Sequence, residues 1–397
     1  MTANVAEKVP NRAAQLGRAG IAVAAATVVA NFLAYLVPLF GARKLDAGNL
    51  SAIATVMAIL AIASVPALGL QMAVAVGRAK HGAVHRLNRL ILLAVAATVI
   101  PLLLLTPVLS HTLRLPWQVV PFAAVTVAAV TVASGWLGVL QGSMRFSRLA
   151  LGMVLLGITR CGGIIAGLLA GFDLVGMVAL GAAVSVLATA AIRPLLPPPV
   201  DLAEPPPMLS REVWAAGSAT LALFVLSYAD LIAARYLLPD VNSAEYAVLN
   251  VLTKGAIWAP GVITVMALPY FARDVRNSRK LAVLAVTAFG ALLVAGTALL
   301  GPLAMRAAGG EAYVHLAGYA PAFAALGALY AIVFVLTNAQ VAGGAKSPAA
   351  PLWVVAAGFT TAVLVLRPGI TGIVTCALAA AAASVIGVGV ALHLRTR

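Results

Sequence analysis

The segment that decides the organisation of this chain is residues 193–212, RPLLPPPVDLAEPPPMLSRE. Proline lacks a backbone N–H and its ring clashes within a helix, so the clustered prolines prevent one continuous helix from crossing this polar segment. The sequence on both sides is long and hydrophobic. We therefore predict an N-terminal lobe over residues 1–193, a proline-rich linker over 194–212 and a C-terminal lobe over 213–397.

The composition of both lobes is that of a membrane protein. Hydrophobic residues make up 63% of the 397-residue chain, charged residues make up 9%, and the mean hydropathy is +1.06. So few charges cannot cover the surface of a soluble domain of this length. Because a spanning helix needs about 20 mostly apolar residues, the sequence predicts an all-α polytopic membrane protein with about twelve transmembrane helices, six in each lobe. The predicted spans are residues 19–40, 50–76, 90–109, 117–140, 149–171, 174–192, 213–238, 245–271, 281–304, 315–340, 349–366 and 369–393.

The distribution of positive charge predicts the orientation of these spans. With the N-terminus in the cytoplasm, 18 of the 26 lysines and arginines fall in inside segments, 5 fall outside, and the remaining 3 lie within spans. This positive-inside bias predicts that both termini and the 194–212 linker are cytoplasmic. The net charge of +15 is then a topology signal that suits an anionic inner leaflet, and we expect no nucleic-acid partner.

The two halves of the chain resemble each other. The first half contains FLAYLVPLFGARKLDAGNLSAIA and the second contains FVLSYADLIAARYLLPDVNSAEYA. Arg43 aligns with Arg235 at an offset of 192, and Pro66 aligns with Pro260 at an offset of 194. Each half has an even number of predicted spans, so both halves enter the membrane in the same direction. We therefore predict a parallel repeat about an axis along the membrane normal, with a site between the lobes near the midplane.

The sequence lacks the residue patterns of an enzyme. The five histidines are scattered over loops and span ends, and the two cysteines, Cys161 and Cys376, fall in different halves. Nothing resembles a pair of catalytic carboxylates or a set of zinc ligands. We expect no catalytic residue, no metal and no other cofactor.

Four ionisable residues fall inside predicted spans: Arg160, Asp230, Arg235 and Lys254. A charge at a helix centre costs about 2.5–3.5 kcal/mol on insertion scales, so each needs a partner or water. At about 1.5 Å of rise per residue, Asp230 and Lys254 lie at similar depths on antiparallel neighbours, which predicts a salt bridge between them. Arg235 lies near the outer end of its span, from which its side chain can reach the headgroups.

Arg160 precedes a stripe of small residues, Gly163, Gly167 and Gly171, with the GxxxG spacing that favours close helix packing. Gly167 lies seven residues beyond Arg160, at almost the same angle around an α-helix. This spacing predicts that Arg160 faces the helix bundle.

Two interpretations of these charges remain open. In the structural one, Asp230 pairs with Lys254, and Arg160 caps carbonyls at a kink. In the functional one, Arg160 and Lys254 make a water-filled cavity net positive, which attracts an anionic headgroup such as a diphosphate, and Asp230 takes part in proton or cation coupling.

Several stretches resemble polysaccharide-biosynthesis flippases, the O-antigen and teichoic-acid exporter type within the multidrug/oligosaccharidyl-lipid/polysaccharide exporter superfamily. They are ANFLAYLVPLFGARKLDAGNLSAIATV (30–56), PALGLQMAVAVGR (66–78), LQGSMRFSRLALGMVLLGITRCGGIIAGLL (140–169) and YADLIAARYLLPDVNSAEYAVLNVLTKGAIWAPGVITVMALPYFAR (228–273). The related peptidoglycan-precursor flippases carry arginines in their first span, whereas residues 20–40 contain no charge, and this departure argues against that subtype.

The resemblance implies a function in cell-surface polysaccharide biosynthesis. Two six-helix lobes around a V-shaped cavity would flip a polyprenyl-diphosphate-linked oligosaccharide from the inner to the outer leaflet of a bacterial plasma membrane by alternating access. The expected substrate-binding residues are Arg160 and Lys254 at the phosphate end, with Asp230 and Arg235 in the stretch where relatives carry a polar span-7 motif.

Two alternatives remain. One is a cation-coupled small-molecule or multidrug exporter of the same superfamily, which would depend on Asp230. The other is a non-transporting membrane scaffold whose basic inner loops bind glycan-assembly enzymes on the cytoplasmic side. The sequence specifies neither the glycan, nor the coupling ion, nor the oligomeric state.

Overall fold

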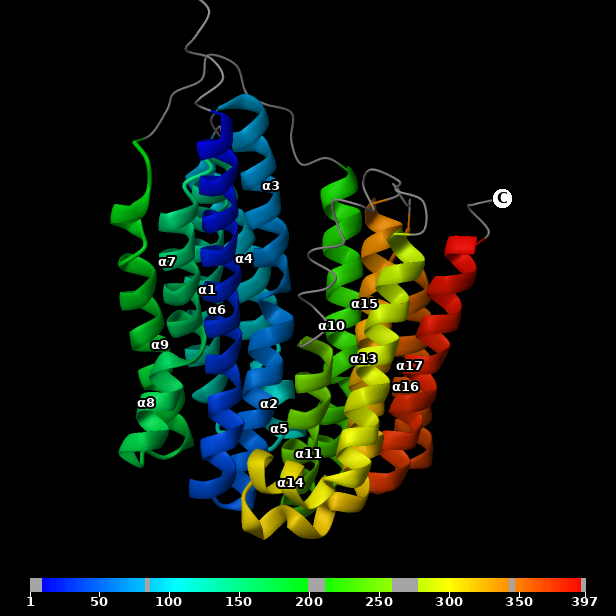
Figure 1. Cartoon of the computed structure of the whole chain (residues 1–397). Coiled ribbons are helices and arrows are strands. Elements are labelled where there is room, and N and C mark those ends of the chain that lie inside the picture. Colours follow the sequence, from blue (N-terminus) through cyan, green and yellow to red (C-terminus); the bar gives the residue numbers. More distant parts are fainter. Residues whose placement is uncertain (1–8, 83–85, 199–210, 259–277, 343–346, 394–397) are drawn as a thin grey trace, which may run out of the picture. The chain divides into compact units, whose positions relative to one another are not determined.

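A computed structural model describes residues 9–82, 86–198, 211–258, 278–342 and 347–393, and these residues are almost entirely helical, with no strand among them (Figure 1). The helices of the first half are α1 (Val9–Lys44), α2 (Ala47–Ala63), α3 (Val65–His81), α4 (Leu87–Leu104), α5 (Thr106–Thr112), α6 (Val119–Gly142), α7 (Phe146–Gly157), α8 (Gly163–Ala170) and α9 (Leu174–Ala190). Those of the second half are α10 (Arg211–Leu237), α11 (Asp240–Trp258), α13 (Ser278–Leu299), α14 (Gly301–Ala308), α15 (Ala320–Ala342), α16 (Ala350–Leu366) and α17 (Ile370–His393).

The predicted polytopic all-α fold is confirmed. Within the described ranges, ten helical stretches are long and apolar enough to cross a membrane, and α16 is a shorter apolar helix. Helix α11 begins the predicted span 245–271, and residues 259–271 of that span lie outside the described residues. Every other predicted span coincides with a helix or with two consecutive helices.

One predicted span consists of two helices with a break between them. The range 50–76 was expected as one helix, but α2 ends at Ala63 and α3 begins at Val65. Pro66 has no N–H to offer the carbonyl of Ile62, and its ring crowds that carbonyl, so the chain turns at Ser64. At the other end of α2, Asp46 is the N-cap, and its carboxylate accepts the backbone N–H of Asn49 at 2.9 Å. That bond holds the pKa of Asp46 below its ordinary value.

The contacts divide the chain into two compact units. The first unit contains Met1–Val37, Pro66–Leu105 and Gln118–Met208, and the second contains Pro38–Val65, Thr106–Trp117 and Leu209–Arg397. Residues 38–65 and 106–117 thus belong with the second half of the chain, because α2 packs against α10 and α11 and Arg114 donates to the carbonyls of Arg235 and Leu238. The lobes 1–193 and 213–397 are a division by chain order and stay a prediction.

In the first unit, α6 is the central helix. It packs against α4, α7 and α9, and a π-helical turn at Ile158–Gly162 joins α7 to α8 beside α9. The core around α6 consists of Ala67, Val130, Ala133, Leu137, Leu140, Leu149, Leu156 and Ile192.

In the second unit, α15 is the central helix. It packs against α11, α13 and α17, while α10 packs against α2 and α16. Its largest fully buried side chains include Tyr246, Phe323 and Tyr330, and the rings of Tyr246 and Phe323 meet edge to face with centroids 5.0 Å apart. This packing fixes α10 and α11 side by side, and these two helices carry three of the four intramembrane charges.

Candidate functional site

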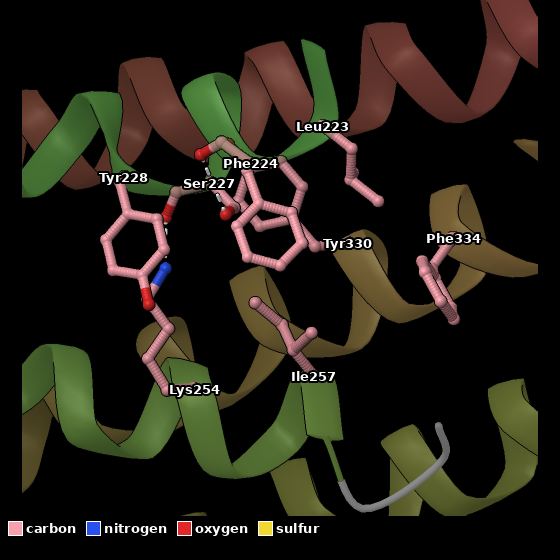
Figure 2. Close-up of a pocket in the computed structure, with 8 residues that line it drawn as sticks. All are labelled: Leu223, Phe224, Ser227, Tyr228, Lys254, Ile257, Tyr330 and Phe334. Carbon is pink, nitrogen blue, oxygen red and sulfur yellow. Dashed lines mark hydrogen bonds between the residues drawn. The ribbon is translucent and has the colours of Figure 1, made fainter. Parts of the chain in front are cut away.

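Lys254 lies on α11 and reaches toward α10 (Figure 2). It is about 14 residues beyond the start of α11 at Asp240, which is roughly 21 Å along the helix axis. Its ammonium donates a hydrogen bond to the carbonyl of Ser227 and lies 3.4 Å from the ring centroid of Tyr228. A cation over an aromatic face is attracted by the ring quadrupole, so Tyr228 partly offsets the cost of the charge in the span.

A small pocket lies beside this lysine, between α10, α11 and α15. Two of the hydroxyl groups in its lining bond to the protein: that of Tyr330 donates to the carbonyl of Leu226, and that of Ser227 donates to the carbonyl of Phe224, both at 3.1 Å. The pocket therefore presents one cation surrounded by apolar and aromatic walls. Figure 2 shows the lining residues, Leu223, Phe224, Ser227, Tyr228, Lys254, Ile257, Tyr330 and Phe334.

Asp230 lies on α10 and is completely buried. Its Oδ2 accepts hydrogen bonds from the Tyr246 hydroxyl at 3.0 Å and from Nδ2 of Asn250 at 3.1 Å. Its Oδ1 is buried and has no hydrogen-bond partner in the part of the chain that the structure describes. The acid is thus held by two neutral donors, with one oxygen left over.

The predicted salt bridge between Asp230 and Lys254 is wrong. Tyr246, Asn250 and Lys254 follow one another at intervals of four residues, so they form one stripe on α11. The first two meet Asp230, whereas Lys254 lies a turn further along and meets Ser227, which is one turn before Asp230 on the antiparallel α10. Tyr246 and Asn250 were missed by the sequence analysis, although their spacing from Lys254 was a usable signal.

Arg160 lies in the π-helical turn Ile158–Gly162 and is half-buried. Single π turns in α-helices frequently occur at functional sites. Among the described residues its guanidinium has neither a hydrogen-bond partner nor a carboxylate partner, so it caps none of their carbonyls. The seven-residue spacing to Gly167 assumed a regular α-helix, and the wider π turn changes the angle between the two residues.

The glycine stripe after Arg160 is confirmed in part. A Cβ on Gly163 would lie 2.4 Å from the carbonyl oxygen of Leu180, and a Cβ on Gly167 would lie 2.9 Å from the Cα of Met177, so both glycines allow α8 to approach α9. Gly171 has no neighbour within 4 Å of its Cβ position and instead ends α8 with a φ of +77°.

Arg235 is 3% exposed and is held by the protein itself. Its Nε donates to the carbonyl of Leu113 at 2.9 Å, its Nη2 donates to that of Arg114 at 3.1 Å, and its Nη1 lies 3.0 Å from Oδ1 of Asp240. Arg114 in turn binds the segment that contains Arg235, because its Nη2 donates to the carbonyls of Arg235 at 2.5 Å and Leu238 at 2.8 Å. Its Nη1 shares Oδ1 of Asp240 at 3.1 Å.

The expectation that Arg235 reaches the headgroups is therefore wrong for this state, since its side chain is inside the cluster. Sequence reasoning missed Arg114 and Asp240, which complete the cluster. The available signal was two opposite charges in short segments expected on the same side of the membrane.

The four predicted site residues are divided between the two compact units. Asp230, Arg235 and Lys254 belong to the second compact unit, while Arg160 belongs to the first. A cavity shared by Arg160 and Lys254 stays a prediction. No group of three His, Cys, Asp or Glu side chains placed to hold a metal ion occurs in the described part of the chain.

No protein-family model and no curated protein matches the sequence of this chain. Its fold, however, is similar to several solved structures. The lipid II flippase MurJ in an inward closed conformation superposes with a TM-score of 0.67 at 14% identity, covering 95% of this chain and 88% of that one. An inward-facing multidrug resistance MATE family transporter of the MOP superfamily gives 0.61 at 17% identity, covering 92% of each chain.

A third similar structure is a MOP superfamily transporter from Pyrococcus furiosus Vc1, with a TM-score of 0.55 at 14% identity, covering 93% of this chain and 94% of that one. The identities are low, but each superposition extends over nearly the whole chain. The protein therefore has the fold that these MOP-superfamily transporters share.

Proposed function

We propose that this protein is a membrane transporter that moves a polyprenyl-diphosphate-linked oligosaccharide from the inner to the outer leaflet by alternating access. The observation that supports this proposal is that two cations within predicted spans, Arg160 and Lys254, make no ion pair with any described carboxylate. Asp230, the acid expected to neutralise Lys254, bonds to Tyr246 and Asn250 instead. Cations without an ion pair at such depth are costly, and a diphosphate supplies a negatively charged partner through charge-assisted hydrogen bonds.

The walls of the pocket at Lys254 favour the lipid end of such a substrate. A sugar carries hydroxyl groups, and burying them against Leu223, Ile257 and Phe334 without hydrogen bonds would cost several kcal/mol, about 2–7 for each group. A hydrocarbon chain enters from lipid at little cost, because lipid tails are as apolar as leucine. We therefore place the phosphate at Lys254, with the first chain units against the apolar walls and the glycan outside this pocket.

The setting follows from the charge distribution and the resemblance. We place the protein in a bacterial plasma membrane with both termini in the cytoplasm, so that Arg43 and Arg235 lie at the outer ends of their helices. The cytoplasmic basic segments are where glycan-assembly enzymes would bind.

A second candidate function is cation-coupled export of small molecules. It is supported by Oδ1 of the buried Asp230, which has no hydrogen-bond partner among the described residues and offers a proton or a cation an acceptor. Multidrug resistance MATE transporters also have a similar fold.

The experiment that tests the proposal measures flipping in proteoliposomes, using a fluorescent polyprenyl-diphosphate oligosaccharide and an impermeant quencher. We expect Arg160→Ala and Lys254→Gln to slow flipping about ten- to hundredfold, since a hydrogen bond to a charged group contributes about 1.5–3 kcal/mol. Arg89→Ala and Lys280→Gln are the matched controls, because both side chains are exposed, and they should flip at the parent rate.

Unchanged flipping by both Arg160→Ala and Lys254→Gln would contradict the proposed role of the cations. Absence of flipping, together with dye efflux that is lost in Asp230→Asn, would establish the second candidate instead.

A further inference from the structure

Three pairs of residues are related by one offset. Ser51 and Ser243 are 192 residues apart, and the same separation relates Arg43 to Arg235 and Arg114 to Arg306. All six residues belong to the second compact unit, in which segments 38–65 and 106–117 of the first half pack with the second half. The internal repeat is thus visible inside one unit.

The contacts of these residues are exchanged between the two halves. Arg43, near the end of α1, donates from Nη2 to the carbonyls of Arg306 at 3.1 Å and Ala307 at 3.4 Å, in the last turn of α14. Arg235, near the end of α10, donates from Nη2 to the carbonyl of Arg114 at 3.1 Å, just beyond the end of α5. The arginine of each half therefore holds the backbone of the short helix of the other half, as a two-fold relation requires.

Ser51 and Ser243 lie where such an axis would pass. Their hydroxyl groups bond to each other, one from α2 and one from α11, and both residues are 1% exposed. A residue that contacts its own repeat mate must lie close to the axis that relates them. The arginines that bond to the opposite half and the serine pair are thus parts of one arrangement. We call it the arginine latch (Arg43, Arg114, Arg235, Arg306, Ser51 and Ser243).

The carbonyl groups held by Arg43 and Arg114 lie in the last turn of a helix or just beyond it. The last carbonyls of a helix have no N–H within their own helix, and cations are favourable at that end. The two sides differ in strength, because Asp240 joins Arg114 and Arg235 on one side, whereas on the other Glu311 bonds to Arg306 alone, at 2.9 and 3.0 Å. Arg235 itself is buried, whereas Arg43 is exposed.

We propose that the arginine latch holds the ends of the two repeats together in this state and opens during each transport cycle. The inference rests on the alternating access of the proposed function. Within the second compact unit, its hydrogen bonds join helix ends that come from the two halves of the chain, so these helix ends cannot separate while the bonds persist. Every bond of the latch is a polar bond, and water can replace it when the latch opens. The free-energy cost of opening is therefore smaller than the cost of exposing a large apolar contact.

The test measures the accessibility of Ser243 without any substrate. In a background of Cys161→Ser and Cys376→Ser, Ser243→Cys supplies the only thiol of the chain, and an impermeant thiol reagent is added on the side predicted to be outside. We expect slow labelling in this parent and about tenfold faster labelling in Arg43→Ala and in Arg114→Ala, which corresponds to about 1.4 kcal/mol each. Arg367→Ala, an exposed arginine on the same predicted side, is the matched control and should label at the parent rate.

Thermal midpoints separate opening from unfolding. Arg43 is exposed, so Arg43→Ala should keep the parent midpoint while its labelling rises. Labelling at the parent rate in both Arg43→Ala and Arg114→Ala would overturn the latch. Faster labelling would also overturn it if every variant that labels faster has a lower thermal midpoint, because unfolding would then explain the labelling.

A disulfide supplies the second measurement. Ser51→Cys with Ser243→Cys in the same background should cross-link on oxidation and stop flipping until the bond is reduced. Parent flipping by the cross-linked protein would overturn the latch as a moving part. The labelling experiment needs no substrate, so it tests the latch separately from the proposed function. If Arg43→Ala and Arg114→Ala speed labelling but the parent protein does not flip the lipid-linked oligosaccharide, the proposed substrate is overturned and the latch is supported.

Discussion

Arg235 and Lys254 are both cations on the α10–α11 pair, yet their surroundings give them different roles. Three nitrogen atoms of Arg235 have partners in the protein, and its side chain is 4% exposed. Lys254 has one hydrogen bond from a group with three donors, among the described residues, and it lines a pocket. A saturated cation stabilises the structure, whereas an unsaturated one beside a pocket is available to a ligand.

We predict that Arg235→Ala lowers stability more than it changes any substrate contact. The substitution leaves the carbonyls of Leu113 and Arg114 without their donor and Asp240 with one partner fewer. Breaking a buried pair costs about 3–5 kcal/mol, and because Asp240 is half exposed we expect about 2–3 kcal/mol. Thermal unfolding in detergent measures it, with Arg89→Ala as the exposed control. A variant with the parent midpoint but no flipping would instead mean that Arg235 binds substrate.

The sequence identified these charged residues but could not assign their partners. Depth along a helix placed Asp230 near Lys254, but the register of α11 against α10 brings Tyr246 and Asn250 to the acid. A shift of one turn exchanges the partners of every residue on the stripe. The register depends on the packing of α10 and α11 around α15, and a local sequence pattern contains no information about that packing.

At the level of elements, α8 and α9 depend on glycine for their contact. A Cβ at Gly163 would lie 2.4 Å from the carbonyl oxygen of Leu180 and 2.7 Å from the Cα of Gly181. Both atoms belong to the backbone of α9, so no side chain can move aside. The helices would have to separate.

We predict that Gly163→Ala destabilises the protein by about 1–3 kcal/mol through this overpacking. The matched control is Gly358→Ala on α16, where a Cβ meets nothing within 4 Å and alanine gains up to about 1 kcal/mol of helix propensity. Thermal midpoints of the two variants should therefore move in opposite directions. Equal midpoints would show that α8 and α9 are not in this contact.

The spanning helices were predictable, because the length and apolarity that the membrane requires are properties of the local sequence. Two interruptions were not predicted. The break before Pro66 follows from the missing N–H of proline. Proline is nevertheless tolerated inside α1 at Pro38 and inside α4 at Pro101, so the presence of a proline alone does not predict where a helix breaks. The π turn at Ile158–Gly162 has no sequence signature that we recognise.

At the scale of the whole molecule, the internal repeat is the feature that sequence and structure share most closely. The offset of 192 that aligns Arg43 with Arg235 also separates two serines that bond to each other. What the sequence could not provide is the grouping of residues 38–65 and 106–117 with the second half, because that grouping consists of contacts between segments remote in the chain. The arginine latch lies entirely among those contacts.

The most direct test of the proposed function is made in cells depleted of this protein. Mass spectrometry of polyprenyl-linked intermediates, combined with leaflet-specific labelling, would locate and identify the cargo. We predict that a diphosphate-linked glycan accumulates on the inner leaflet and that expression of the parent protein, but not of Lys254→Gln, clears it. An unchanged pool of lipid-linked intermediates would contradict lipid-linked oligosaccharide flipping.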